Sequence, residues 1–137
     1  MDSKNILIFF GMLFGHFVGD YLFQWKNMSN YKRQSFWKNK EPFSEYRYNF
    51  IGYLMMHGYV WAFCITFPMF LLIWNDTTGN QLILTYYVIA QFLNAFCHSL
   101  IDHLKANKKL FNDMTDQSLH MLQIFATWIG WIIVASV

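Results

Sequence analysis

Residues 15–24 read GHFVGDYLFQ, and this stretch decides how the rest of the chain is interpreted. His16 and Asp20 lie four residues apart in it, just over one helical turn, so both side chains project from one face of a helix. The apolar segment that contains them begins near Asn5 and has the length of about 20 residues that a bilayer crossing needs. Ionisable side chains are costly at bilayer depth, so their presence there indicates a functional site.

The composition of the whole chain agrees with a membrane protein. Of its 137 residues, 55% are hydrophobic, 21% are aromatic and only 13% are charged, whereas a soluble domain carries about 25% charged residues. Cys64 and Cys97 both fall in apolar segments, so we interpret them as buried packing residues rather than as a disulfide. The first apolar run carries its own His and Asp and no cleavage site, which favours a retained span over a signal peptide.

Four segments are long and apolar enough to cross a bilayer, which predicts an all-α, four-helix transmembrane bundle formed by a single domain over residues 1–137. The expected spans are residues 5–24, 49–74, 82–104 and 113–137. Short connections make neighbouring spans antiparallel. Pro68 should kink the second span or mark its outer end. Gly15 and Gly19 form a small-xxx-small pattern that lets another helix approach closely.

The connection over residues 25–48 is rich in basic and aromatic residues, which predicts an interfacial segment, partly an amphipathic helix. Six basic residues lie there and three more lie in residues 105–112, so nine of the ten Lys and Arg residues share one side of a four-span bundle. The positive-inside rule makes that side cytoplasmic and puts both termini outside. The basic residues then anchor to anionic lipid, and we expect no nucleic acid as a partner.

The His and Asp pattern recurs in the other spans. His98 and Asp102 repeat the spacing in the third span, Asp116 and His120 reverse it in the fourth, and His57 stands alone in the second. At about 1.5 Å of rise per residue, the histidines lie roughly 10–14 Å below the cytoplasmic edge and the aspartates roughly 5–8 Å below it. An antiparallel helix requires the reversed order, so the pattern predicts one cluster at one depth.

Imidazoles together with carboxylates are the ligand set of a divalent metal, with Zn²⁺ as the leading candidate and Mn²⁺ or Fe²⁺ as alternatives. The predicted ligands are His16, Asp20, His57, His98, Asp102, Asp116 and His120. Asp20, Asp102 and Asp116 are also the candidate catalytic residues, as ligands or general bases. Two alternative roles for the cluster remain open: its polar side chains could only hold the helices together, or they could form a pathway for protons or ions.

Some neighbouring polar residues have different expected roles. His103 is five residues from His98, so it lies on another face, and we interpret it as an interfacial histidine. Gln24 and Gln117 lie near the same membrane end and could hydrogen-bond the aspartates. Asn94 shares the face of His98 and either supports the site or bonds a neighbouring helix.

These motifs resemble a family of small integral membrane proteins of bacteria and their phages whose domain has no known function. That family shows H-x3-D-x3-Q in the first span, a lone His in the second, H-x3-D in the third and D-Q-x2-H in the fourth. The resemblance covers nearly the whole chain and implies a location in the bacterial inner membrane. The family is similar in style to other small membrane proteins predicted to be metal-dependent hydrolases. The resemblance implies that the site residues here are His16, Asp20, Gln24, His57, His98, Asp102, Asp116, Gln117 and His120.

The leading functional hypothesis is a metal-dependent hydrolase that acts on a lipid or lipid-linked substrate at the inner leaflet. The second is a non-enzymatic membrane factor that binds another membrane protein or a second copy of itself, with the metal as a structural clamp. The third is an ion or proton conduit, which the scarcity of polar residues in the outer halves of the spans disfavours.

Overall fold

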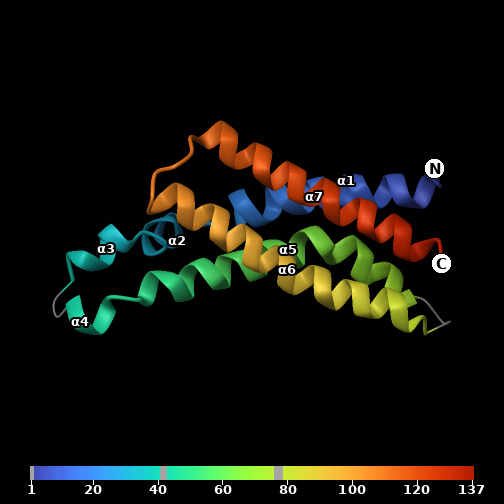
Figure 1. Ribbon diagram of the computed structural model, residues 1–137, viewed down its shortest axis with the longest axis horizontal. Coiled ribbons are helices and arrows are strands. Elements are labelled where there is room, and N and C mark those ends of the chain that lie inside the picture. Colours follow the sequence, from blue (N-terminus) through green and yellow to red (C-terminus); the bar gives the residue numbers. More distant parts are fainter. Residues whose placement is uncertain (1, 41–42, 76–78) are drawn as a thin grey trace.

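A computed structural model describes residues 2–40, 43–75 and 79–137, and within them it contains helices and no strands (Figure 1). The four long helical segments each have the length and hydropathy of a membrane span. They are α1 (Ser3–Phe17) with its π-helical continuation η1 (Val18–Leu22), α5 (Asn49–Asn75), α6 (Gln81–Ala106) and α7 (Asp113–Ala135). The predicted all-α, four-helix transmembrane architecture is confirmed.

Side-chain caps define where three of these helices begin. Asn80 Oδ1 accepts a hydrogen bond from the amide of Leu82 at 3.0 Å, and Asn112 Oδ1 accepts one from Thr115 at 2.8 Å. Asp2 caps α1 in the same way through the amide of Lys4. Each cap satisfies an amide that a helix N-terminus otherwise leaves without a partner.

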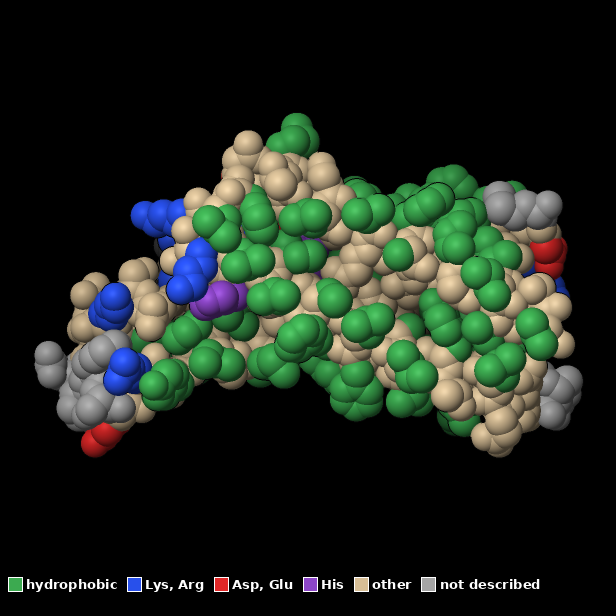
Figure 2. All heavy atoms as spheres, viewed as in Figure 1, with side chains coloured by type: hydrophobic (Ala, Val, Ile, Leu, Met, Phe, Trp, Pro, Cys, Tyr) green, Lys and Arg blue, Asp and Glu red, His purple; other side chains and the backbone are tan. Residues whose placement is uncertain are grey.

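The spans form a ring in which α5 contacts α1 and α6, and α7 contacts α6 and α1. Both chain termini lie at one end of this bundle and the short helices α2 to α4 lie at the other (Figure 1). Apolar side chains cover the outer surface along the spans, and basic side chains gather at the end that carries the short helices (Figure 2). An apolar exterior of this kind suits a hydrocarbon environment.

Glycines allow the helices to approach closely around α5. A Cβ on Gly15 would lie 2.2 Å from the carbonyl oxygen of Cys64, and one on Gly19 would lie 2.9 Å from the Trp61 ring. The close approach predicted from the Gly15 and Gly19 pattern is therefore confirmed. Gly58 has the same role toward α6, where a Cβ would lie 2.2 Å from Ser99 Oγ.

One expectation about α5 is narrowed and another is wrong. Pro68 does not mark the outer end of the span, because the helix continues to Asn75, and a kink at Pro68 stays a prediction. Cys64 and Cys97 are free and partly exposed, so the prediction that both are buried is wrong. Cys64 lines the outer groove between α1 and α5, so its side chain is not enclosed by the bundle.

The interfacial connection forms three short helices instead of one amphipathic helix. They are α2 (Lys26–Tyr31), α3 (Gln34–Lys38) and α4 (Phe43–Tyr46). The rings of Trp37 and Tyr53 stack with centroids 5.6 Å apart, and Tyr31 packs on Tyr53 at 4.9 Å. This aromatic cluster fixes α2 and α3 against the beginning of α5.

Candidate metal centre

Three histidines from three helices meet inside the bundle. His57 on α5, His98 on α6 and His120 on α7 are 1%, 0% and 0% exposed. The His98 ring lies between the other two, with centroids 5.0 Å from His57 and 4.2 Å from His120. Their burial keeps water away from ring nitrogens that would otherwise be hydrated.

Two aspartates bring carboxylate oxygens to these rings. Asp20 Oδ1 lies 3.4 Å from His57 Nε2 and 3.6 Å from His98 Nε2. Asp102 Oδ2 lies 3.6 Å from His57 Nε2 and 3.7 Å from His98 Nε2, and its Oδ1 lies 3.9 Å from His120 Nε2. The structure therefore contains two overlapping groups that could hold a metal ion, Asp20–His57–His98 and His98–Asp102–His120.

The distances between the donor atoms suit coordination of a shared metal ion better than hydrogen bonds between the side chains. Among the described residues, the Nε2 atoms of His57, His98 and His120 have no hydrogen-bond partner. Separations of 3.4 to 3.9 Å to the carboxylates are longer than an N–H···O hydrogen bond of about 2.7–3.2 Å. Two ligands at about 2.0–2.1 Å from a tetrahedral ion are roughly 3.3 Å apart. The spacing is therefore close to that of ligands around a shared cation.

A π-helical turn places Asp20 at this cluster. In η1 the amide of Phe23 donates to the carbonyl oxygen of Val18, five residues earlier, at 3.0 Å. Such single π-helical turns are frequent at functional sites because they widen the helix locally. The regular four-residue spacing of His16 and Asp20 did not predict this turn, which continues α1 to Leu22 rather than to Gln24.

Asp116 joins the cluster from α7 and connects it to Lys105. Its Oδ1 lies 3.5 Å from His120 Nε2, and Lys105 Nζ donates to its Oδ2 at 2.7 Å. Lys105 also pairs with Asp113 at 2.9 Å. Its sequence position indicated only a basic residue of a connection, but Lys105 lies in the last turn of α6 and neutralises a buried carboxylate.

His16 lies beside the cluster with both ring nitrogens in use. Trp61 Nε1 donates to His16 Nδ1 at 2.9 Å, so that nitrogen carries no proton. His16 Nε2 therefore carries it and donates to Gln117 Oε1 at 3.1 Å. Gln117 Nε2 in turn donates to Asp116 Oδ2 at 3.3 Å, which is the predicted bond to an aspartate. His16 supports the site from outside the two metal-holding groups.

Trp61 is a site residue that the His and Asp motifs did not predict. Besides its hydrogen bond to His16, its ring stacks on His98 with centroids 4.2 Å apart and an angle of 19° between planes. It is fully buried. Its position four residues after His57, on the same face of α5, is the signal that could have identified it.

Lys32 is the second residue that the motifs did not predict. Its Nζ donates to Asp102 Oδ2 at 2.5 Å and also to Gln24 Oε1. Although it belongs to the interfacial connection, it is only 6% exposed. The side-chain amide of Asn107 donates to the Lys32 carbonyl at 3.0 Å. Gln24 thus reaches the site through Lys32 rather than through an aspartate.

Other polar residues near the spans hold the helices together. Asn94 Nδ2 donates to Thr127 Oγ1 at 2.9 Å, and Gln123 Nε2 donates to Asn94 Oδ1 at 2.8 Å, so Asn94 connects α6 to α7. Ring stacking holds His103 against Phe50 with centroids 5.7 Å apart. His103 lies outside both metal-holding groups, in agreement with its expected separation from the site.

A polar cavity of about 820 Å³ leads from the cluster toward the end of the bundle that carries the short helices. Asp20, Asp102 and Asp116 line it together with basic side chains. The basic lining residues are Lys32, Arg33, Lys105 and Lys109. The cavity therefore reaches the carboxylates from that end of the bundle, whereas the three histidine rings do not line it.

The fold and the cluster define a small four-span membrane protein with a buried His/Asp centre. Residues 8–136 match a family described as a protein of unknown function, DUF3307, and the chain belongs to that family. A comparison with curated proteins finds no match. A comparison with solved structures finds none either.

Proposed function

We propose that this protein is a metal-dependent membrane hydrolase that acts on a lipid or lipid-linked substrate. The observation that carries the proposal is the set of three buried Nε2 atoms without hydrogen-bond partners among the described residues, which face carboxylates at 3.4 to 3.9 Å beneath a polar cavity. A structural site is closed, whereas a catalytic metal site keeps a coordination position open to its substrate. The cavity supports the catalytic alternative.

The proposed ligands are the members of the two groups, namely Asp20, His57, His98, Asp102 and His120. One imidazole lone pair binds one cation, and His98 belongs to both groups, so a single ion is the simplest occupant. Mixed nitrogen and carboxylate oxygen donors favour Zn²⁺, with Mn²⁺ and Fe²⁺ as alternatives. Such an ion acts as a Lewis acid and makes a nucleophile available from water near neutral pH.

The charges of the chain's own residues support a divalent ion in the cavity. Asp20, Asp102 and Asp116 supply three negative charges, and Lys32 and Lys105 supply two positive charges through ion pairs at 2.5 and 2.7 Å. Among the described residues, Asp20 lies at ion-pair distance only from histidine nitrogens. No lysine among them offsets its charge, and a cation beside it would.

The aspartates facing the cavity are the proposed proton-handling groups. Asp20 and Asp102 line the cavity and lie within 3.7 Å of histidine nitrogens, so either can accept a proton from the attacking water. Asp116 is 2% exposed and bonded to Lys105, which suits a positioning role for His120. His16 is assigned the same kind of supporting role because its two ring nitrogens are occupied.

The proposed location follows from the distribution of charge. Basic side chains gather at the end of the bundle that carries the short helices (Figure 2). Four of them line the polar cavity. The positive-inside rule favours the cytoplasmic side of a bacterial inner membrane for that end, with both termini outside. The ester and phosphodiester bonds of lipids in the inner leaflet would then lie level with the cavity.

Element analysis of the full chain tests the metal site. The protein is purified in neutral detergent without chelator, unmodified and as His98→Gln, with His103→Gln as a control on the same helix. We expect about one metal ion per chain in the unmodified protein and in the His103 variant, and a large loss in the His98 variant. Absence of metal from the unmodified protein would overturn the proposal.

A non-enzymatic clamp is the second candidate, and one observation favours it. The cluster takes residues from η1, α5, α6 and α7, so an ion would tie all four spans together. Such a protein would act by binding another membrane protein or a second copy of itself. Incubation with bacterial lipid extract separates the two candidates. A hydrolase releases cleavage products, and a chelator stops their release without unfolding the protein. A clamp releases none.

A further inference from the structure

We infer that the substrate is an anionic, phosphate-bearing lipid whose headgroup enters the polar cavity and one of whose chains lies in a groove between α1 and α5. This inference rests on the proposed function, since it names the substrate class of the same site. It is carried by a second cavity that contributes nothing to the metal centre. That cavity has a volume of about 960 Å³.

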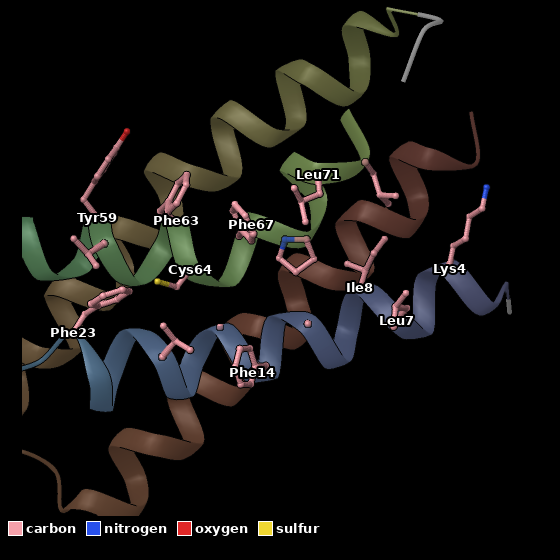
Figure 3. A pocket seen from close by; sticks show the side chains of 16 residues that line it. Lys4, Leu7, Ile8, Phe14, Phe23, Tyr59, Phe63, Cys64, Phe67 and Leu71 are labelled. Carbon is pink, nitrogen blue, oxygen red and sulfur yellow. The ribbon is translucent and has the colours of Figure 1, made fainter. Parts of the chain in front are cut away.

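The groove is apolar along nearly its whole length. Side chains of α1 form one wall and side chains of α5 form the other, with Phe23 at one end and Lys4 at the other (Figure 3). From Val18 to Lys4 the wall is about 21 Å long at 1.5 Å per residue. A hydrocarbon core is about 30 Å thick, so the groove can take a chain that extends through one leaflet.

The groove and the polar cavity share one wall. Val18 and Phe23 line the groove, whereas Asp20, Tyr21 and Gln24 line the polar cavity. The π-helical turn η1 and the residues just after it therefore separate the two spaces. A lipid whose chain occupies the groove has its headgroup beside the opening of the cavity and within reach of the carboxylates.

The rim of the polar cavity selects the headgroup by charge. Arg33 and Lys109 line it, and among the described residues neither has a carboxylate within salt-bridge distance. Guanidinium and ammonium groups are the side chains that proteins use to bind phosphate. Two such groups at the mouth of a membrane-level cavity favour an anionic lipid over a neutral one.

The turn that ends α6 places Lys109 at the cavity. Its φ is +55°, which lies in the left-handed region where glycine is favoured and a lysine is uncommon. The chain nevertheless carries a lysine here, and the side chain lines the cavity. The amide of Lys109 donates to the carbonyl oxygen of Lys105 at 3.2 Å, so this left-handed turn closes the C-terminal end of α6.

Lipid binding to the full chain in neutral detergent, measured by native mass spectrometry, tests the inference. The probes are phosphatidylglycerol, phosphatidylcholine and diacylglycerol with identical chains, and inorganic phosphate alone. We expect affinity to fall in that order, because only the first combines a net negative headgroup with chains. Equal binding of the three lipids, or binding of inorganic phosphate as tight as that of phosphatidylglycerol, would overturn the inference.

Paired variants assign the binding to the two cavities. The double variant Arg33→Gln/Lys109→Gln should weaken phosphatidylglycerol binding by roughly 10- to 30-fold. The control Arg47→Gln/Lys108→Gln removes the same charges from exposed residues that do not line the cavity, and it should change binding less than about twofold. Equal losses in both would overturn the headgroup assignment.

A matched pair of variants tests the groove. Val60→Trp fills the groove and should weaken binding of every chain-bearing probe, whereas Val88→Trp, on the exposed surface of α6, should not. Lipids with shorter chains give the same test without a substitution, and affinity should fall as the chain shortens. No dependence on chain length would overturn the groove assignment.

The metal content of the same samples separates this inference from the proposed function. Metal present without headgroup preference overturns only the substrate assignment. Headgroup preference retained in a protein that lacks metal overturns the hydrolase and leaves a lipid-binding protein.

Discussion

Replacing Lys32 with methionine removes the cation from a buried ion pair and leaves the Asp102 carboxylate without a positively charged partner. The side chains of Lys32 and Asp102 are only 7% and 9% exposed, and the atoms are 2.5 Å apart, so solvent screens the pair weakly. Breaking one partner of such a pair costs about 3–5 kcal/mol, because the remaining charge stays buried. For a chain of this size that corresponds to a fall in Tm of roughly 10–20 °C.

The loss of stability in Lys32→Met depends on whether a metal ion is bound. A divalent ion beside Asp102 supplies the positive charge that Lys32 no longer provides, so added Zn²⁺ should recover a large part of the lost Tm. Lys32 Nζ and a metal also compete for Asp102 Oδ2, so the variant should bind metal more tightly than the unmodified protein. Neither effect is expected for a lysine that only anchors the interfacial connection to headgroups.

The assay is thermal unfolding followed by circular dichroism in neutral detergent, with chelator and with Zn²⁺. Lys38→Met is the matched control, because Lys38 is exposed on the same connection, and it should change stability by less than about 0.5 kcal/mol. The double variant Lys32→Met/Asp102→Asn removes both charges and should regain stability in chelator. An unchanged Tm for Lys32→Met in chelator, or a loss that Zn²⁺ does not reduce, would refute the reasoning.

Two further predictions concern packing and the interfacial connection. Gly58→Ala places a Cβ 2.2 Å from Ser99 Oγ and should destabilise the protein by about 1–3 kcal/mol, whereas Gly52→Ala on the same helix meets nothing within 4 Å and should stabilise it by about 0.5–1 kcal/mol. Chemical denaturation of both variants measures this contrast, and equal effects would contradict the packing argument. Asn107→Ala removes the 3.0 Å hydrogen bond to the Lys32 carbonyl and should raise hydrogen exchange in α2 and α3, with Asn39→Ala as an exposed control. Unchanged exchange would show that another contact holds these helices.

Helix periodicity was sufficient to predict the spans and the meeting of His and Asp side chains from different helices at one level of the bundle. Every residue of an α-helix adds the same rise and rotation, so the four-residue spacings of His98 with Asp102 and Asp116 with His120 specify both a face and a level. The separation of His103 from the cluster followed from the same rule. The four-span fold followed from composition, because only lipid accommodates so many apolar side chains outside a core.

The tertiary structure alone decided which partner each side chain meets. The use of both ring nitrogens of His16 depends on Trp61 and Gln117, which come from different helices. Periodicity within one helix contains no information about such neighbours.

The path of residues 25–48 was the least predictable part of the chain. Lys32 looked like one of several headgroup anchors, because nothing in the local sequence distinguishes it from Lys38 or Lys40. Its burial results from contacts with Asp102, Gln24 and Asn107, two of which lie some 70 residues further along the chain. A charge in a connecting segment has no helical repeat to position it, so only the folded bundle determines whether it faces water or a buried carboxylate.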